Sequence, residues 1–283
     1  MAVLIEAGKM CELGVETLKK EVSDIADRIG QCPQFVIINA SDDPGNARYV
    51  KNKVQEGQSI GINVNVLRQG EDCTTEDILD NIEYCRLHKI PVIFQMPAYP
   101  HLDTKRILES ITPEIDADGF TKEWLGEVAM GNDNVVAPAT PKGVINLLNH
   151  FNVEISGKTA LVIGRSNHVG KPMSTMLINR GATVITANSR TENLQDLVQQ
   201  SDIIVSCVGK THLISPYDVK EGAVLIGVGF TYIEGKQVLD FDIDALLKES
   251  KASLVTNRVR CTGKATVHSL IDNVVQLYRM NYK

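Results

Sequence analysis

The fold is decided by the stretch TALVIGRSNHVGKP, residues 159–172. Its first five residues are an apolar run rich in β-branched side chains, which is typical of a buried parallel strand. A loop bounded by Gly164 and Gly170 follows, and a helix is predicted from about Met173 to Arg180. Glycine lets the backbone turn sharply, and the first N–H groups of a helix are free to hold a phosphate. The stretch therefore predicts the nucleotide-binding corner of an α/β domain.

More strands follow this unit, and each ends near a glycine. They are expected at residues 183–186, 203–206 and 223–226. Strands in this order, with helices between them, indicate a doubly wound sheet of the Rossmann type. The loop has two glycines where the usual dinucleotide fingerprint has three, so an ordinary strand-to-helix turn is the alternative interpretation. Its place after the first strand of the domain favours a cofactor site.

The end of the second of these strands helps to choose the cofactor. An NAD site usually has Asp or Glu there, to bind the ribose hydroxyls. Residues 187–191 read Ala-Asn-Ser-Arg-Thr and contain no carboxylate. A 2′-phosphate would be bound by Ser189 and by Arg165 or Arg190, so NADP is expected. A solvated surface charge is the simpler alternative for Arg190.

The first half of the chain also alternates between helix and strand. Expected helices cover 11–29, a segment starting at Pro44 with Asp43 as N-cap, and 74–89 with Thr75 as cap; expected strands cover 35–38, 62–66 and 90–94. This alternation predicts an α/β domain with a largely parallel sheet. The last helix, expected at 265–278, can close back onto it. The predicted domains are 1–140 with 263–283, and a Rossmann-type domain over 141–262.

Composition narrows the class of protein. The chain has 283 residues and a formal charge of −6, with no basic stripe, so nucleic acid is not an expected partner. No apolar run reaches about 18 residues, and the N-terminus lacks a signal-peptide pattern, so no membrane span or secretion is expected. Six scattered cysteines indicate reduced thiols in a cytoplasmic protein and no zinc site.

Tyr49 and Lys53 stand out in the segment ARYVKNK, residues 47–53. Positions four apart lie on one face of a helix, so both side chains point the same way. Val50 and Val54 form the adjacent row and are expected to face the core. A partly desolvated lysine has its charged form disfavoured, which can bring its pKa into the catalytic range. A tyrosine hydroxyl beside it can orient or relay a proton.

The pair also matches the Tyr-x-x-x-Lys motif of short-chain dehydrogenases. In those enzymes the glycine-rich loop comes first and the pair follows it. Here the pair precedes the loop that starts at Gly164 by more than about a hundred residues. That resemblance therefore fails on topology.

Loop segments supply further polar residues, each with a simple explanation of its own. Gln95 can cap the strand before it, Asp118-Gly119 is a common turn pair, and Pro141 suits the first position of a helix. Taken together with the earlier motifs, they stand in the order Tyr-x-x-x-Lys, Gln-x-Pro, Asp-x-Asp-Gly-Phe, Pro-x-Thr-Pro-x-Gly and Gly-Arg-Ser-x-x-Val-Gly-x-Pro. In this order and spacing the chain resembles the bifunctional methylenetetrahydrofolate dehydrogenase/methenyltetrahydrofolate cyclohydrolase family over nearly its whole length.

The resemblance implies an enzyme of folate one-carbon metabolism with two activities. It oxidises methylenetetrahydrofolate with NADP, and it then hydrolyses the methenyl product to formyltetrahydrofolate. By this resemblance Lys53 is the general acid/base. Tyr49 packs near the folate and tunes Lys53. Gln95 hydrogen-bonds Lys53, and Asp118 grips the pterin edge, since a carboxylate can accept two parallel hydrogen bonds.

The same resemblance assigns cofactor positions in the second domain. Gly164, Arg165, Ser166, Ser189 and Phe230 match positions that contact NADP in the family. Thr266 matches a threonine near the nicotinamide. Family members are commonly homodimers through the nucleotide domain, so a homodimer is expected.

The chain departs from the family pattern before its last helix. The family usually has Pro-Val-Pro-Gly-Gly-Val-Gly-Pro-Met-Thr where residues 257–266 read Asn-Arg-Val-Arg-Cys-Thr-Gly-Lys-Ala-Thr. Arg258, Arg260 and Lys264 can bind an anion there or form a solvated basic loop. Changes also occur at residues 227–231, where Asp-Val-Gly-Ile-Asn is expected, and near Trp124, where an Asn is expected.

These departures keep alternatives open. One is a divergent paralogue with one activity weakened. The dehydrogenase activity is the one expected to be lost, because the altered residues lie nearer the cofactor. Another is an NADP-dependent dehydrogenase for a different small substrate. A third is a nucleotide- or folate-binding regulator that has lost catalysis.

Overall fold

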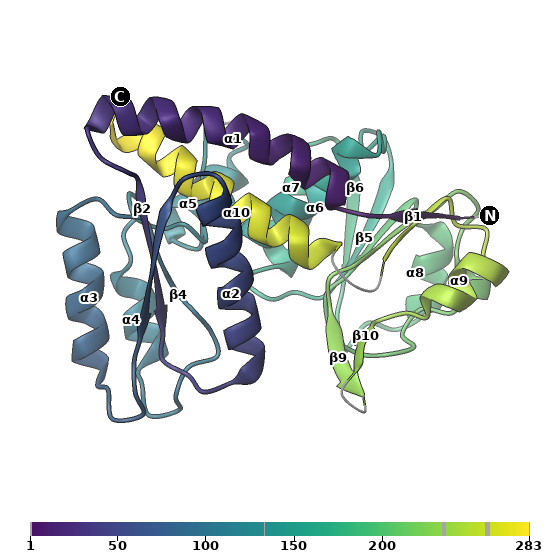
Figure 1. Ribbon diagram of the computed structural model, residues 1–283. Coiled ribbons are helices and arrows are strands. Elements are labelled where there is room, and N and C mark those ends of the chain that lie inside the picture. The colour runs from purple at the N-terminus through teal and green to yellow at the C-terminus, as the bar shows by residue number, and fades with distance from the viewer. Residues whose placement is uncertain (1, 133, 234–235, 258–260, 283) are drawn as a thin grey trace. The chain divides into compact units, whose positions relative to one another are not determined.

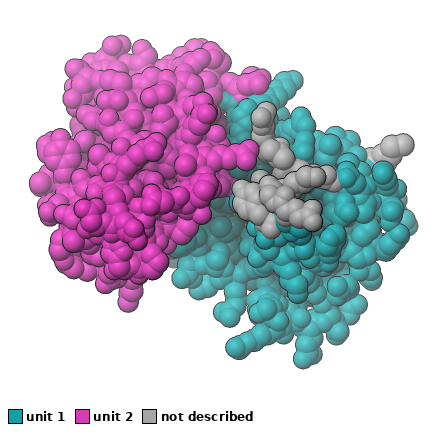
Figure 2. Space-filling model, turned by 60° about the horizontal axis from the view of Figure 1, so that its bottom comes forward, with its two compact units in different colours: residues 1–11, 127–133, 140–266 teal, residues 12–126, 134–139, 267–283 magenta. Residues whose placement is uncertain are grey.

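The structure is a computed structural model that describes residues 2–132, 134–233, 236–257 and 261–282. Its contacts divide the chain into two compact units, coloured separately in Figure 2. Unit 1 comprises residues 1–11, 127–133 and 140–266, and unit 2 comprises residues 12–126, 134–139 and 267–283. Neither unit is one continuous stretch of sequence. The boundaries predicted from the sequence, 1–140 with 263–283 against 141–262, stay a prediction.

Unit 1 is built on a parallel sheet with the strand order β1-β11-β8-β7-β5-β6. Figure 1 labels strands β1, β5 and β6 of this sheet. Its strands are short apolar segments: β1 (Val3–Ile5), β5 (Thr159–Ile163), β6 (Thr183–Ala187), β7 (Ile203–Ser206), β8 (Val224–Gly227) and β11 (Leu254–Thr256). Every residue of β7 and β8 is buried, as expected for strands covered on both faces. The predicted doubly wound α/β fold is confirmed.

The remaining elements of unit 1 connect and flank these strands. The helices are α6 (Ala139–His150), whose first residue belongs to unit 2, α7 (Gly170–Ile178), α8 (Leu194–Gln200), the 3-10 turn η1 (Pro216–Asp218) and α9 (Ile243–Glu249). Strands β9 (Phe230–Ile233) and β10 (Lys236–Leu239) pair antiparallel, apart from the main sheet.

The strand order contains a reversal at β5. Strand β6, the next in sequence, lies on one side of β5, and β7 lies on the other. The connection from β6 to β7 therefore passes over β5. Ligands of doubly wound sheets bind at such a reversal, beyond the carboxyl ends of the strands. The loops that begin at Gly164 and Cys207 leave the sheet at this point, so the predicted glycine loop occupies the expected ligand position.

Unit 2 contains a smaller parallel sheet with the strand order β3-β2-β4. Its elements are β2 (Gln34–Asn39), α2 (Pro44–Ser59), β3 (Asn63–Arg68), α3 (Thr75–Leu87), β4 (Val92–Phe94) and α4 (Thr104–Ser110), together with most of α1 (Gly8–Ile29), α5 (Lys122–Ala129) and α10 (Thr262–Asn281). Alternate residues of β2 serve opposite faces. Phe35 and Ile37 pack in a core with residues of α1 and α10, and Val36 and Ile38 pack in a core with residues of α3 and α4.

Capping explains where the helices of unit 2 begin. The Asp43 side chain accepts a hydrogen bond from the Asn46 N–H, and Pro44 is the first residue of α2, as predicted. The prediction for α3 was wrong by one residue. Thr74, and not Thr75, is the N-cap, because Thr74 and Asp77 form a reciprocal capping box.

Short elements account for most of what the sequence did not predict. Strands β1 and β11 have three residues each, and β1 pairs with β11 from the opposite end of the chain. The α9 helix and the β9–β10 pair were also not predicted. Helix α6 begins at Ala139, before Pro141, and α7 begins at Gly170, before Met173. Both start inside loops that looked irregular, because the first turn of a helix needs no internal N–H partner.

Two searches of the described residues bear on the class of protein. No helix among them is long and apolar enough to cross a membrane. In the same residues, no group of His, Cys, Asp and Glu side chains forms a candidate metal site. The six cysteines are free thiols.

Candidate active site

Lys53 lies on α2, and its side chain is 9% exposed. Residues Asn46, Val50, Lys53 and Gly57 are the buried positions of this helix, at spacings of three, four and seven that share one face. Tyr49 is half-buried and lies one turn before Lys53. The spacing predicted Val50 and Val54 as the core-facing row, with the Tyr49–Lys53 pair beside it. The structure instead buries Lys53 with Val50 on the inner face of α2 and leaves Val54 half-buried.

The Lys53 amine donates a hydrogen bond to Gln95 Oε1 over 2.8 Å. Gln95 follows β4, and its backbone N–H donates to Ile38 O over 2.8 Å. Its Nε2 donates to Met96 O at 2.8 Å and to Asn46 Oδ1 at 3.4 Å. These bonds fix which end of the carboxamide faces the lysine, so Gln95 presents an acceptor.

Burial lowers the pKa of the Lys53 amine below its usual range, and the negative charge of Asp118 opposes that shift. The amine is therefore easier to deprotonate than an exposed lysine. It has an uncharged acceptor at Gln95 and an electrostatic partner at Asp118, which is half-buried. A buried amine placed in this way can act as a general acid/base.

Asp118 lies in a turn that other residues hold rigidly. The Asp116 carboxylate is buried and accepts the Gly119 N–H at 2.9 Å and the Thr121 N–H at 2.7 Å. Burial raises the pKa of Asp116 to about 6, and the backbone bond from Thr121 partly opposes this. The fully buried Asn273 of α10 donates to Ala117 O over 2.9 Å. Asp118 therefore sits between fixed neighbours.

Gly119 is required at this turn. Its φ is +73°, and a Cβ there would lie 2.7 Å from Val136 O. L-residues rarely adopt this backbone conformation. The Asp-Gly pair expected as a turn is thus confirmed as a turn, and any side chain at 119 would push the loop that carries Asp118.

In unit 1 the two glycines of the loop after β5 lie close together. Gly164 has a φ of +125°, and a Cβ at Gly170 would lie 2.2 Å from Gly164 O. Ser166 Oγ accepts the N–H groups of Val169 and Gly170 at 3.2 and 3.3 Å. Arg165 and Ser166 are exposed. Both glycines are required so that the start of α7 can approach the end of β5.

The other predicted cofactor residues follow neighbouring strands. Ser189 is exposed after β6, whose Ala187 pairs with Ile163 of β5. Phe230 opens β9, and its carbonyl oxygen would lie 3.0 Å from a Cβ at Gly209. Thr266 is half-buried on α10, where its Oγ1 donates to Thr262 O over 2.9 Å.

The structure thus forms two groups from the predicted site residues. Tyr49, Lys53, Gln95 and Asp118 belong to unit 2. Gly164, Arg165, Ser166, Ser189, Phe230 and Thr266 belong to unit 1. In the altered loop, Arg258 and Arg260 lie outside the described residues, and Lys264 is half-buried on α10.

Known families match both units. The sequence model "Tetrahydrofolate dehydrogenase/cyclohydrolase, catalytic domain" matches residues 5–118, and "Tetrahydrofolate dehydrogenase/cyclohydrolase, NAD(P)-binding domain" matches residues 138–282. The chain belongs to the tetrahydrofolate dehydrogenase/cyclohydrolase family. The family resemblance drawn from the motifs is confirmed.

Individual members of this family are similar to the chain over nearly their whole length. The "Bifunctional protein FolD" of Lactobacillus helveticus is 35% identical, covering 99% of this chain and 98% of the relative. The crystal structure of the bifunctional FolD methylenetetrahydrofolate dehydrogenase/cyclohydrolase from Campylobacter jejuni is 31% identical, with a TM-score of 0.94, and covers 99% of this chain and 100% of its own. The Trypanosoma brucei enzyme complexed with NADP cofactor and inhibitor is 27% identical, with a TM-score of 0.92. The match covers 99% of this chain and 98% of that enzyme.

Some residues that shape the site of this family member were not singled out from the sequence. Asn46 is buried and donates to Pro97 O over 2.7 Å, and its spacing of seven from Lys53 was a usable signal. Asp116 stood in the quoted Asp-x-Asp-Gly-Phe motif, three residues before the N–H that it binds. Asn273 gave no local signal, because its acceptors lie 136 and 156 residues away in sequence.

Proposed function

We propose that this protein is a bifunctional enzyme of folate one-carbon metabolism. It oxidises 5,10-methylenetetrahydrofolate to 5,10-methenyltetrahydrofolate with NADP and hydrolyses that product to 10-formyltetrahydrofolate. Membership of the tetrahydrofolate dehydrogenase/cyclohydrolase family over both units supports both steps. So does the likeness to relatives described as bifunctional over nearly the whole chain.

The observation that carries the proposal is the buried Lys53 amine bonded to Gln95 over 2.8 Å. Hydrolysis of a methenyl cation needs a proton removed from the attacking water and then a proton delivered to the leaving ring nitrogen. One amine can serve both transfers, and the lowered pKa makes its neutral, proton-accepting form easier to reach than in an exposed lysine. Gln95 orients the amine without raising its pKa as a carboxylate would.

Tyr49 and Asp118 act on the substrate side of this lysine. Tyr49 packs near the folate and tunes Lys53 from one turn away. Asp118 binds the amino and amide edge of the pterin, because a carboxylate accepts two parallel N–H bonds. The same carboxylate favours the charged form of Lys53, so substrate binding to Asp118 changes the balance at the lysine.

NADP fits the residues of the glycine loop. Gly164 and Gly170 leave room where a Cβ would meet backbone, and exposed Arg165, Ser166 and Ser189 supply a cation and hydroxyls. Residues 188–191, directly after β6, contain no carboxylate that would repel a 2′-phosphate. NADP, when bound, accepts the hydride of the oxidation step. Phe230 and Thr266 complete the proposed cofactor contacts.

An optical assay tests the proposal, because methenyltetrahydrofolate absorbs in the near ultraviolet. Wild type should form this species from the methylene substrate with NADP and should also consume it. Lys53→Met should slow hydrolysis by about 10²- to 10⁴-fold, the usual contribution of a general acid/base, while folate binding remains. Asp118→Asn should weaken folate binding and leave NADP binding unchanged. A wild-type protein that binds NADP but neither forms nor consumes the methenyl species refutes the proposal.

The same assay separates the alternatives. Hydrolysis without oxidation identifies a divergent paralogue with an impaired dehydrogenase. Two further properties belong to the proposal: a homodimer through the nucleotide-binding unit, and a cytoplasmic location. Sedimentation of the purified protein tests the first.

A further inference from the structure

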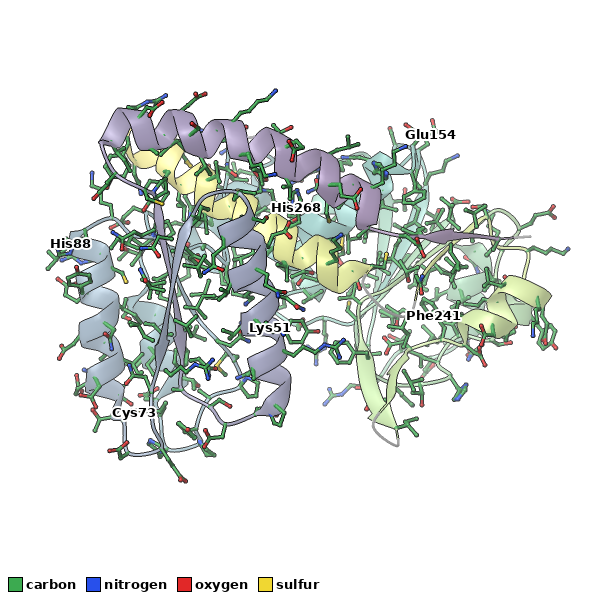
Figure 3. All side chains as sticks on the ribbon, viewed as in Figure 1. Lys51, Cys73, His88, Glu154, Phe241 and His268 are labelled. Atoms are coloured by element: carbon green, nitrogen blue, oxygen red, sulfur yellow. The ribbon has the colours of Figure 1, made fainter. Side chains whose placement is uncertain are left out.

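A buried pair of ionisable side chains joins two helices of unit 2 and is not used by the proposed mechanism. His268 Nδ1 on α10 lies 2.9 Å from Glu56 Oε1 on α2. The two side chains are 9% and 17% exposed. Because an ionised carboxylate only accepts hydrogen bonds, the imidazole Nδ1 is the donor. Figure 3 labels His268 on α10 and, on α2, Lys51, two residues before Lys53.

A third helix is shaped to receive this imidazole. A Cβ at Gly14 of α1 would lie 2.1 Å from His268 Nε2. Glycine within a helix costs about 1 kcal/mol relative to alanine. Helix α1 nevertheless has a glycine, Gly14, at the position where the His268 ring approaches it. The ring therefore occupies a space that depends on the residue at position 14.

Glu56 follows Lys53 by three residues on α2. Residues three apart are neighbours on a helix surface, and helical side chains lean toward the N-terminus, so Glu56 leans toward Lys53. Acid–base pairs three residues apart do form in this chain, with the acid as the earlier residue: Lys19 binds Glu16 at 2.8 Å and Arg86 binds Glu83 at 2.6 Å. Glu56 instead binds His268, and Lys53 binds the uncharged Gln95.

We propose that His268 is a positioning residue for the hydrolytic step. Its imidazole binds the Glu56 carboxylate of α2 and so keeps that carboxylate away from the Lys53 amine. This inference rests on the proposed function of Lys53. A released Glu56 would lie within reach of a buried amine, where a nearby opposite charge favours the charged form. Lys53 would then keep its proton to higher pH and would turn from Gln95 toward Glu56.

Among the described residues, Asp118 is the charged group that shifts the pKa of the Lys53 amine, so an added effect of Glu56 can be separated from it. The turn after β4 contributes the uncharged Gln95, the loop of unit 2 contributes Asp118 with Asp116 behind it, and α2 contributes Tyr49 one turn earlier. On α1 the position that faces His268 is Gly14. Farther along α1 and α10, Arg279 interacts with Glu21 and Asp272 as a separate group.

The test is the pH dependence of methenyltetrahydrofolate hydrolysis in His268→Leu. Leucine keeps the bulk of the ring but cannot bind a carboxylate. The limb of the profile that follows Lys53 should move to higher pH by about one unit, the lower end of the effect of a close opposite charge. His268→Gln, which retains a donor, should leave the limb near its wild-type position. Glu56→Gln combined with His268→Leu should return the limb to its wild-type position, because the side chain released at position 56 is then uncharged.

Packing is controlled by a second route. Gly14→Ala combined with His268→Ala removes the imidazole and places a methyl group in the vacated space. This variant should show the same upward shift, and it replaces His268→Leu if that variant does not fold. An unchanged limb in either variant, or a shift that remains after Glu56→Gln is added, overturns the inference.

A measurement without turnover separates this inference from the proposed function. The Lys53 amine can be titrated by NMR in protein labelled at the lysine ε-carbons, with Lys53→Met to assign the signal. Its pKa should rise by about one unit in His268→Leu. A wild-type protein without hydrolase activity refutes the proposed function, whereas an unmoved Lys53 titration refutes the role of His268.

Discussion

The Lys53 amine and the Gln95 carboxamide oxygen are 2.8 Å apart, and Gln95 is itself held by Met96 O and Asn46. Gln95→Leu should leave the buried amine without its acceptor. Hydrolysis should fall by about 10- to 100-fold, the equivalent of one hydrogen bond to a charged group. The measurement is the decay of methenyltetrahydrofolate absorbance at saturating substrate.

Gln95→Glu provides the matched comparison at the same position. The shape of the side chain is kept, but a carboxylate now faces Lys53 and favours its charged form. The hydrolysis profile should therefore shift to higher pH, whereas Gln95→Leu should lower the rate without that shift. Equal profiles for the two variants would contradict an electrostatic role for the uncharged acceptor.

Asp116 predicts a pH-dependent component of stability. Burial raises its pKa from 3.8 to about 6 in the folded protein, so the folded state binds this proton more tightly than the unfolded chain. The contribution to stability is fully present below about pH 4 and is lost as the pH rises through 6. The difference amounts to at most about 3 kcal/mol. Denaturant unfolding of wild type at pH 4.5, 5.5 and 6.5 measures it.

Asp116→Asn removes this titration and serves as the control. Its unfolding free energy should change less with pH over the same range. An amide offers one oxygen to the two backbone N–H groups that Asp116 binds, so the turn around Asp118 should loosen and the KM for folate should rise. If wild type and Asp116→Asn show the same pH dependence, the assignment to Asp116 is wrong.

The sequence predicted best where a local pattern determines the structure. Spacing predicted that Tyr49 and Lys53 share one side of a helix next to a core-facing row, and Asp43 with Pro44 marked where that helix begins. It predicted less where pairing joins distant segments. Strand β1 is three residues long and becomes a strand only by pairing with β11 near the other end of the chain. No local sequence pattern predicts strand β1.

The same distinction applies within the site. The Lys53–Gln95 contact was anticipated only through the family resemblance, because no periodicity links a helix to the end of a strand 42 residues later. The His268–Glu56 pair spans 212 residues and was not anticipated at all. Gly14, which makes room for it, looked like any glycine in a helical pattern. Its role emerges only once α1 and α10 are seen to pack together.

The close approach of Gly170 to Gly164 predicts a specific loss of cofactor binding. In Gly170→Ala the new Cβ would meet Gly164 O at 2.2 Å, so the backbone of the loop must shift. The protein should lose about 1–3 kcal/mol of stability from overpacking, and NADP affinity should fall. Gly126→Ala is the control, because Gly126 is exposed on α5 with no atom within 4 Å of the added Cβ. It should gain up to about 1 kcal/mol and keep NADP affinity.

Ser189 predicts how the protein discriminates between NADP and NAD. It is exposed just after β6, at the place where NAD-binding sheets carry a carboxylate for the ribose hydroxyls. Ser189→Asp should repel a 2′-phosphate and accept hydrogen bonds from a free ribose. The ratio of kcat/KM for NADP to that for NAD should fall by about 10- to 100-fold, the scale of one charge-assisted hydrogen bond. Ser189→Ala, which adds no charge, should lower it much less; equal effects of the two variants would mean that this position does not face the 2′-phosphate.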